Sequence, residues 1–428
     1  MINVTDPDLL QATALTREGR LAEATALLQR MLGAPASAAG EPAHAARPTE
    51  PVIGPATTVI DGVFERIAEA DTPASSPSET DRTRDGNRNA KAARPSQSPA
   101  MLRDLLGSLG RSLPGLGAHG LTKPSIPPTD LVPAGGRFIA GSYSNGAGTR
   151  TFKLYVPSGY VGQALPLVVM LHGCTQSPDD FAAGTRMNLL AEEQTCLVAY
   201  PEQSPAANPS KCWNWFNADD QQRGQGEPAL IAGITRQIMS DYAVDPQRIY
   251  VAGLSAGAAA AAIMAATYPD LFAAVGVHSG LACGAASDLP SAFMAMRQGA
   301  AAAPILSTRG SVSGRREMVP TIVFHGDRDS TVHPGNGDRV IAHSMVTAAL
   351  LTERSEHGRS PGGLDYTRST HVDAAERTML EQWVVHGLGH AWSGGSPSGS
   401  YTDPRGPDAA REMMRFFLAH AHPGSPTA

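Results

Sequence analysis

The stretch RIYVAGLSAGAAAAA, residues Arg248–Ala262, decides the fold that the sequence predicts. Its first part, Ile249–Val251, is apolar and rich in strand-forming residues, which predicts a short buried strand. Its last part is a run of alanines, the residue with the highest helix propensity. The G-x-S-x-G motif Gly253–Gly257 stands between them, so the chain must turn sharply from a strand into a helix at Ser255. A serine on such a turn has an exposed hydroxyl, and glycines flank it because side chains there would meet neighbouring backbone.

A second G-x-S-x-G motif occurs at Gly358–Gly362, around Ser360. It follows the polar run Thr352–His357 and has Pro361 directly after the serine, so we expect no strand before it and no helix after it. The flanking residues therefore predict a loop at Ser360, and they favour Ser255 as the nucleophile.

Composition argues against several classes of protein. The 428 residues carry a formal net charge of −6, whereas nucleic-acid-binding proteins usually present a basic face. No apolar run reaches the roughly 18 residues of a membrane-spanning helix, so we expect no membrane span. Residues 1–33 lack the basic start and continuous apolar core of a signal peptide, which by itself predicts a cytoplasmic protein. The four cysteines, Cys174, Cys196, Cys212 and Cys283, match no zinc-binding spacing, and we expect no metal site and no cofactor.

Composition also divides the chain. Residues 6–32 repeat leucine and alanine at helical spacing, so we predict a short helical segment over residues 1–33. Residues 34–130 are rich in Pro, Ala, Ser, Gly and charge, which predicts a disordered linker. Within it, residues 101–116 are amphipathic and predict either a transient helix that packs on the neighbouring domain or a contact with an apolar surface or partner. We expect the folded catalytic domain over residues 131–423.

The remaining chain alternates between predicted strands and helices. Strands are predicted at residues 137–144, 149–156, 165–171, 196–200, 249–252, 273–278, 321–325 and 377–385, and helices at residues 182–194, 227–242, 258–266 and 407–419. The first two strands are joined by Asn145–Gly148, which predicts a hairpin. The alternation predicts an α/β fold with a mainly parallel, doubly wound sheet and an antiparallel N-terminal hairpin.

The serine needs a base, and the base needs a carboxylate that orients it. In this kind of fold the order along the chain is serine, acid, histidine. The predicted strand at residues 321–325 leads into a loop in which Asp327 and Asp329 compete. Asp329 lies deeper in the loop, where its side chain can turn back toward the histidine. Asp327 follows a glycine at the strand end and is expected to cap the turn, so we assign Asp329 as the acid.

Several histidines follow Asp329, and His390 is the candidate base. It lies in the glycine-rich loop Gly387–Gly395 after the last predicted strand, and a loop at the carboxyl end of a sheet can bring a base to the serine. His386 still adjoins the strand and is expected to fill space, while His333 is a candidate for the border of the pocket.

The anionic intermediate of acyl transfer needs two N–H donors. The N–H of Ala256 points out of the predicted helix N-terminus and is the first candidate. The loop after the buried run LPLVVML supplies the second, because Gly173 lets the backbone approach and Cys174 follows it. His172 is expected to orient this loop, and Thr175 is a candidate substrate contact.

Three aromatic residues stand in Cys212–Phe216 (CWNWF), although only 5% of the chain is aromatic. They are either a plug of the core or the apolar wall of a pocket for an acyl or ring-bearing substrate. Their place in a long loop favours the wall, with Trp213 and Trp215 on one side. Trp392, beside His390, is the candidate for the opposite side.

Cys174 and Cys212 lie in loops that are expected to converge on the site. They form either a disulfide or two separate buried thiols. A disulfide would favour an oxidising compartment, which conflicts with the missing signal peptide.

Six motifs occur together and in order. They are LHGCTQ (Leu171–Gln176), YPEQS (Tyr200–Ser204), CWNWF (Cys212–Phe216), GLSAG (Gly253–Gly257), HGDRDSTVHP (His325–Pro334) and GLGHAWSGG (Gly387–Gly395). Over residues 137–420 the chain resembles the esterases of the polyhydroxybutyrate (PHB) depolymerase family, which is related to feruloyl and acetylxylan esterases. The resemblance implies an α/β-hydrolase fold and hydrolysis of carboxylic esters by a serine esterase. Many members of this family are extracellular and carry a disulfide at the positions of Cys174 and Cys212.

The resemblance implies the same site roles: Ser255 as nucleophile, Asp329 and His390 as its partners, and Cys174 and Ala256 as donors of the oxyanion hole. The expected substrate is poly(3-hydroxyalkanoate) or hydroxybutyrate oligomers, with feruloyl or acetyl esters of plant polysaccharide as the alternative. A non-catalytic granule-surface binding protein is the alternative of another class, and the intact serine, acid and histidine disfavour it. The region before residue 131 is a candidate for contact with a polymer or granule surface.

Overall fold

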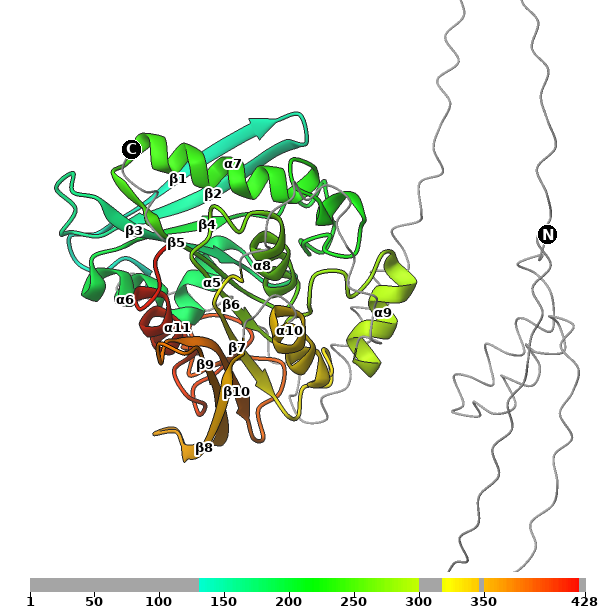
Figure 1. The fold of residues 1–428 in the computed structure, drawn as a ribbon. Helices are drawn as coiled ribbons and strands as arrows, with labels where there is room; N and C mark the ends of the chain where they lie inside the picture. The colour runs from blue at the N-terminus through cyan, green and yellow to red at the C-terminus, as the bar shows by residue number, and fades with distance from the viewer. Residues whose placement is uncertain (1–130, 300–317, 346–349, 423–428) are drawn as a thin grey trace, which may run out of the picture. The chain divides into compact units, whose positions relative to one another are not determined.

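The structure, a computed structural model, describes residues 131–299, 318–345 and 350–422 (Figure 1). The predictions made for residues 1–33, 34–130 and 101–116 lie outside the described residues.

A ten-stranded sheet forms the centre of the described chain, in the order β1-β2-β4-β3-β5-β6-β7-β10-β9-β8. The six strands from β4 to β10 in this order are parallel, and antiparallel pairs complete both sides. The strands are β1 (Arg137–Asn145), β2 (Gly148–Val156), β3 (Leu165–Leu171), β4 (Leu197–Pro201), β5 (Val244–Leu254), β6 (Ala274–His278), β7 (Thr321–Gly326), β8 (Thr352–Arg359), β9 (Asp365–Val372) and β10 (Thr378–Val385).

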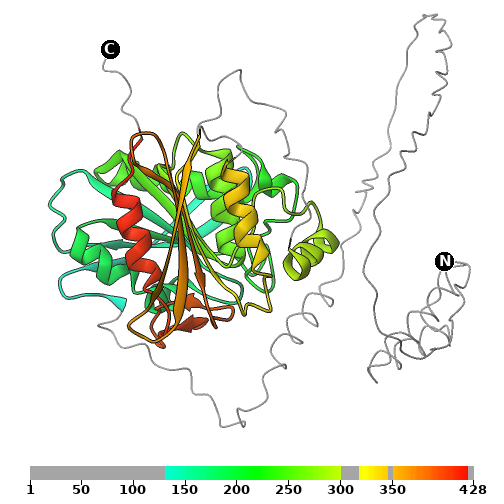
Figure 2. The same cartoon turned by 60° about the horizontal axis from the view of Figure 1, so that its bottom comes forward.

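Helices cover both faces of this sheet. One face carries α7 (Gly226–Asp241), α8 (Ala256–Thr267), α9 (Leu289–Gln298) and α10 (Gly335–Met345), and the other carries α5 (Pro178–Thr185), α6 (Met187–Gln194) and α11 (Ala409–Leu418). Figure 2 shows α10, in yellow, and α11, in red, on opposite sides of the strands.

Strand β3 shows why the parallel strands are apolar throughout. All seven of its side chains are buried. Leu167 and Val169 pack into the core under α7 and α8, whereas Val168 and Met170 pack into the core under α5, α6 and α11. A strand with helices on both faces has no solvent-facing side, so alternation of apolar and polar residues disappears. The predicted α/β fold, with its mainly parallel sheet and N-terminal hairpin, is confirmed.

The structure corrects three details of the prediction. The helix expected over residues 182–194 is two helices, α5 and α6, because Arg186 between them adopts a left-handed conformation with φ 56°. Helices α9 and α10 and the antiparallel strands β8 and β9 were not predicted. Strand β8 is polar and exposed along almost its whole length, so it carries no hydrophobic pattern. It ends at Arg359, so a strand does precede Ser360, contrary to the sequence analysis.

Candidate active site

Ser255 lies on the turn between β5 and α8, with φ 58° and ψ −120°. A left-handed conformation is strained for a residue with a side chain, and such strain is typical of functional sites. A Cβ atom added to Gly253 would overlap the backbone of Gly257, and one added to Gly257 would overlap the carbonyl groups of Leu171 and His172. The two glycines of the motif are therefore required by the close approach of neighbouring backbone.

Asp329 and His390 form a hydrogen-bonded pair. The distance from His390 Nδ1 to Asp329 Oδ2 is 2.7 Å. The other carboxylate oxygen accepts from the N–H groups of Thr331 and Val332, each at 2.9 Å. Burial alone would raise the pKa of the Asp329 carboxyl, but hydrogen bonds from His325, His390 and the Val332 N–H outweigh it and hold this pKa well below its ordinary value. Asp329 is thus ionised while it orients the imidazole.

The register of the sheet places Ser255, Asp329 and His390 at the carboxyl ends of its parallel strands. Leu254 at the end of β5 pairs with His278 of β6, which pairs with Phe324 of β7. The loops after β5, β7 and β10 carry Ser255, Asp329 and His390, and all three strands are parallel. Within the described residues, the Ser255 hydroxyl makes no hydrogen bond to His390. Catalytic hydrogen bonds of this kind are often long before substrate binds.

His278 lies beneath the site and was not singled out from the sequence. Its carbonyl oxygen accepts from the Ser255 N–H at 2.9 Å, and its Nε2 accepts from the Ser393 N–H at 2.9 Å. Burial, together with the charges of His325 and His390, lowers the pKa of His278 well below its ordinary value. An imidazole that favours its neutral form therefore connects the serine turn to the loop that carries His390. Its position at the carboxyl end of β6 was the available signal.

The loop before α5 brings Cys174 close to the serine. A Cβ atom added to Gly173 would lie 3.7 Å from Ser255 Cβ. The Gly173 N–H donates to Gln176 Oε1 at 2.9 Å, which fixes the loop. Among the described residues we find no acceptor for the Cys174 N–H. Ala256 is the first residue of α8, where N–H groups lack a helical acceptor.

His172 orients this loop through both ring nitrogens. Nε2 accepts from the Gln203 N–H at 3.1 Å, so Nδ1 carries the proton and donates to the Gly173 carbonyl at 2.7 Å. Burial lowers the pKa of His172 to about 4, so the ring is neutral at physiological pH.

Cys174 and Cys212 form a disulfide. It joins the loop after β3 to the aromatic loop. The sequence left open a disulfide or two separate thiols, and the structure has the disulfide. Cys196 is a buried thiol whose pKa is raised by burial to about 12, which makes it unreactive.

The three candidate tryptophans are buried. Trp213 and Trp392 are 0% and 1% exposed, and Trp215 is 6% exposed. The Trp213 indole N–H donates to the His172 carbonyl at 3.1 Å, and Trp392 stacks on His278 with ring centroids 5.0 Å apart. This packing argues against the predicted substrate-wall role of Trp213 and Trp392, because their side chains have almost no surface that a substrate can touch.

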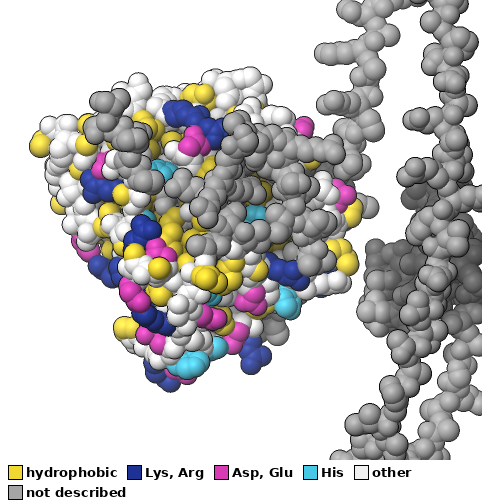
Figure 3. Space-filling model, in the orientation of Figure 1, with side chains coloured by type: hydrophobic (Ala, Val, Ile, Leu, Met, Phe, Trp, Pro, Cys, Tyr) yellow, Lys and Arg dark blue, Asp and Glu magenta, His cyan; other side chains and the backbone are white. Residues whose placement is uncertain are grey.

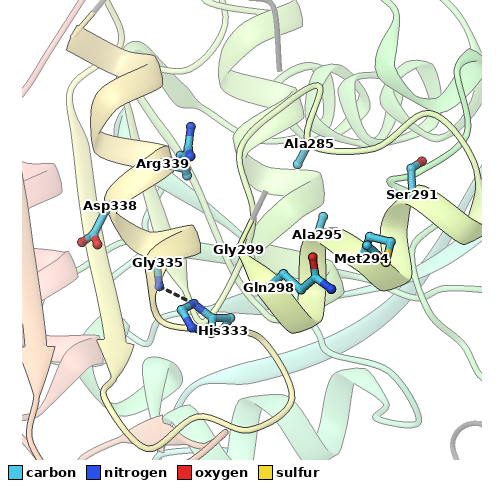
Figure 4. Close-up of a pocket in the computed structure, with 10 residues that line it drawn as sticks. All are labelled: Ala285, Ser291, Met294, Ala295, Gln298, Gly299, His333, Gly335, Asp338 and Arg339. Carbon is cyan, nitrogen blue, oxygen red and sulfur yellow. Dashed lines mark hydrogen bonds between the residues drawn. The ribbon is translucent and has the colours of Figure 1, made fainter. Parts of the chain in front are cut away.

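A pocket of about 670 Å³ opens between α9 and α10 (Figure 4). Its lining residues are Ala285, Ser291, Met294, Ala295, Gln298, Gly299, His333, Gly335, Asp338 and Arg339. His333 donates its N–H to the Met296 carbonyl at 2.7 Å, which anchors the chain after Asp329 to α9. None of the residues assigned to the serine chemistry lines this pocket.

Comparison with known proteins places the chain in a family. A sequence model of the family described as "Esterase PHB depolymerase" matches residues 150–354. Feruloyl esterase B of Neurospora crassa is 30% identical over 236 residues, which are 52% of this chain and 77% of that protein. The chain belongs to the PHB depolymerase esterase family. The family match includes Ser255 and Asp329 and ends before His390.

Two further likenesses concern the family and the fold, in that order. Poly(3-hydroxyalkanoate) depolymerase C of Paucimonas lemoignei is 34% identical over 251 residues; the match spans 58% of this chain and only 59% of that protein. The solved structure of an acetyl xylan esterase from Aspergillus awamori aligns with a TM-score of 0.50 at 21% identity, over 66% of this chain and 99% of that one. That likeness shows that this member of the PHB depolymerase family has the α/β-hydrolase fold. Within its described residues, no helix has the length and apolar character to cross a membrane.

Proposed function

We propose that this chain is a serine esterase in which Ser255, His390 and Asp329 hydrolyse carboxylic esters. The proposal rests on the 2.7 Å hydrogen bond between His390 and Asp329. This bond lies at the carboxyl ends of the parallel strands, where Ser255 occupies its strained turn. Because His390 Nδ1 donates to a carboxylate, its Nε2 is the basic nitrogen. This is the tautomer that a general base for Ser255 requires.

The proposed reaction proceeds through an acyl-enzyme. Ser255 Oγ attacks the ester carbonyl carbon while His390 Nε2 takes its proton, and the oxyanion is stabilised by the N–H groups of Cys174 and Ala256. His390 then gives the proton to the leaving alcohol as the carbon–oxygen bond breaks. A water molecule, activated by His390, attacks the acyl-enzyme and releases the acid and the free serine.

The substrate that we favour is a poly(3-hydroxyalkanoate) or a hydroxybutyrate oligomer. Its support is the 34% identity to the Paucimonas depolymerase. Feruloyl or acetylxylan esters are the second candidate, supported by the match to most of the Neurospora feruloyl esterase. Rates on hydroxybutyrate oligomers, methyl ferulate and acetylated xylan would separate the two, because pocket shape rather than fold decides the substrate. Contact of residues 1–130 with a polymer or granule surface stays a prediction.

The first prediction tests the nucleophile. Ser255→Ala is expected to lower kcat on a p-nitrophenyl ester by about 10⁴-fold or more, with an unchanged fold by circular dichroism. Near-normal turnover would contradict the assignment and would leave the non-catalytic granule-binding alternative as the better account.

The chain offers a matched control in its second G-x-S-x-G motif. Ser360 lies in the turn between β8 and β9, and its hydroxyl contacts the carbonyl groups of Leu364 and Arg405. Ser360→Ala should therefore retain turnover and lose about 1–3 kcal/mol of stability.

A further inference from the structure

Tyr401 is an exposed aromatic residue that neither the proposed mechanism nor the family motifs use. Its side chain is 48% exposed, and its backbone is left-handed with φ 54°. Thr175 is likewise exposed and left-handed, with φ 68°. Two strained, non-glycine residues thus lie together at the surface, and such strain persists only where the surrounding structure enforces it.

Tyr401 connects the two loops on which the proposed chemistry depends. Its carbonyl oxygen accepts at 2.7 Å from the N–H of Trp392, which lies two positions after His390 in the chain. Its hydroxyl lies 3.3 Å from Thr175 Oγ1, directly after Cys174. The Tyr401 side chain therefore extends from the loop that carries the proposed base to the proposed oxyanion loop.

This position is held by a polar network around the buried side chain of Gln176. The side-chain amide of Gln176, 2% exposed, donates to Asp180 Oδ2 at 3.0 Å and to the Ser400 carbonyl at 3.1 Å. The Ser400 N–H donates to Asp180 Oδ1 at 3.0 Å. The same Gln176 also accepts from the Gly173 N–H. One side chain thus fixes both the oxyanion loop and the residue before Tyr401.

The hydrogen bonds around Tyr401 decide which chemical group it can bind. Thr175 Oγ1 donates its only proton to the Cys174 carbonyl at 2.6 Å. In the contact between the two hydroxyls, Tyr401 is therefore the donor and Thr175 the acceptor. The Tyr401 oxygen keeps its lone pairs, so its free capacity is to accept a hydrogen bond. An ester or ether oxygen cannot supply one, whereas a hydroxyl can.

We propose that Thr175 and Tyr401 form a subsite that binds a hydroxyl group of the substrate next to the scissile ester. The inference rests on the proposed esterase function and narrows its substrate class to hydroxyl-bearing esters. The hydroxyl comes either from the acyl side, as the terminal group of a 3-hydroxyacid, or from the alcohol side, as a sugar hydroxyl.

The test uses two matched pairs of esters with the full-length chain. The acyl pair is the phenyl ester of 3-hydroxybutyrate and that of 3-methoxybutyrate. The alcohol pair is a methyl xyloside acetylated at O2 and its 3-O-methyl ether. We expect wild-type kcat/KM to favour the hydroxyl member of one pair, and that pair identifies the source of the hydroxyl.

Tyr401→Phe removes the acceptor oxygen and keeps the ring. It should lower kcat/KM for the hydroxyl member about 3- to 10-fold, mainly through KM, which is the range of one net hydrogen bond. The ratio between the two members should therefore fall toward one. Thr175→Val frees the Tyr401 proton for donation and should lower the same ratio by improving the methoxy member. Tyr143→Phe, on the edge strand β1, is the control and should leave the ratio as in the wild type.

The outcomes separate the two proposals. The subsite is overturned, and the esterase function stands, if the wild type is active but Tyr401→Phe leaves the ratio of kcat/KM between the two members of the pair unchanged. Equal slowing of both members by Tyr401→Phe is one form of this result. A wild type that hydrolyses none of the four esters, nor any p-nitrophenyl ester, removes both.

Discussion

At the scale of single residues, Asp327 and Asp329 show how two neighbouring carboxylates acquire different tasks. Asp329 is 5% exposed and orients His390. Asp327 is partly exposed, and its two oxygens accept from the Gly387 N–H at 2.7 Å and from His386 Nδ1 at 3.0 Å. Asp327 therefore holds the start of the loop that carries His390, while Asp329 contacts His390, the proposed base, directly.

Substitution by asparagine should separate these tasks. Asp329→Asn keeps the shape of the side chain, but its amide N–H₂ can donate a hydrogen bond to His390 Nδ1 and so favour the wrong tautomer of the imidazole. The value of kcat should therefore fall by about 10⁴-fold, as in the serine-protease template. Asp327→Asn keeps one acceptor for the Gly387 N–H and should cost less than about 10-fold. The measurement is kcat on a p-nitrophenyl ester with melting temperatures as the control for folding. Equal losses, or a larger loss at Asp327, would reverse the assignment of the acid.

The contrast between Trp213 and His390 shows what sequence can say about a site. His390 was placed beside Asp329 because order along the chain and the end of a strand restrict a base to few positions, and the two are hydrogen-bonded. Trp213 was expected at a pocket wall because loops are usually exposed. It is buried in the core, where its indole N–H donates to the carbonyl of His172, 41 residues earlier in the chain. A hydrogen bond between residues so far apart in the chain leaves no local pattern in the sequence.

At the scale of secondary structure, predictability followed hydrophobicity. Strands β3 and β6 are buried on both faces and were recognised as apolar runs. Strand β8 has no buried face and was not predicted. The break between α5 and α6 depends on the backbone angle of Arg186, which its residue type does not predict. Helix α10 begins with Gly335 and contains Gly337, so its intrinsic propensity is low and packing against β7 and β10 stabilises it.

The N-terminus of α7 contains a buried glutamate that organises the aromatic loop. Glu227 is 4% exposed and accepts from the Asn214 N–H at 2.7 Å and from the side chains of Asn214 and Gln203. Arg150 lies 3.6 Å away. Burial, and secondly the charge of Asp220, raises the pKa of Glu227 to about 7 despite these hydrogen bonds. The loop that bears Cys212 thus depends on a carboxyl group that titrates near neutrality.

This shift predicts a pH dependence of stability. Because the folded state holds the proton more strongly than the unfolded chain, the contribution of Glu227 is fully present below its ordinary pKa of 4.5 and is lost as pH rises through about 7. The change is on the order of 3 kcal/mol. Urea unfolding of the wild type and of Glu227→Gln from pH 4.5 to 7.5 should show that the difference between them depends on pH. His172, whose lowered pKa acts in the opposite direction over this range, is common to both proteins. A constant difference would contradict the titration.

At the scale of the whole molecule, one edge of the sheet is charged and meets solvent. Strand β8 forms one edge, and its charged side chains are paired with neighbours, as in Arg354–Glu376 and Arg359–Asp365. In the space-filling view, acidic and basic side chains are mixed over the end of the molecule where β8 lies (Figure 3). Charged edge strands oppose pairing with other chains. The sheet is therefore covered on both faces and protected at this edge within the described residues.

This covered sheet predicts where the catalytic unit begins. Deleting residues 1–130 removes none of Ser255, Asp329 and His390, and soluble-ester hydrolysis should stay within a few-fold of that of the full chain. Deleting residues 1–136 removes the Leu131 carbonyl, which accepts from Asn188 Nδ2 at 2.7 Å. That amide is buried, so leaving it unpaired should cost about 1–3 kcal/mol.

Melting curves and p-nitrophenyl ester kinetics of the two truncated proteins provide the measurement. Binding to PHB granules, compared between the full chain and the 131–428 protein, tests in addition whether residues 1–130 contact polymer. We expect the 131–428 protein to melt close to the full chain and the 137–428 protein to melt several degrees lower. Failure of the 131–428 protein to fold would mean that the preceding region completes the core, which the covered faces of the sheet argue against. Equal melting of the two truncated proteins would show that the bond between Leu131 and Asn188 carries no stability.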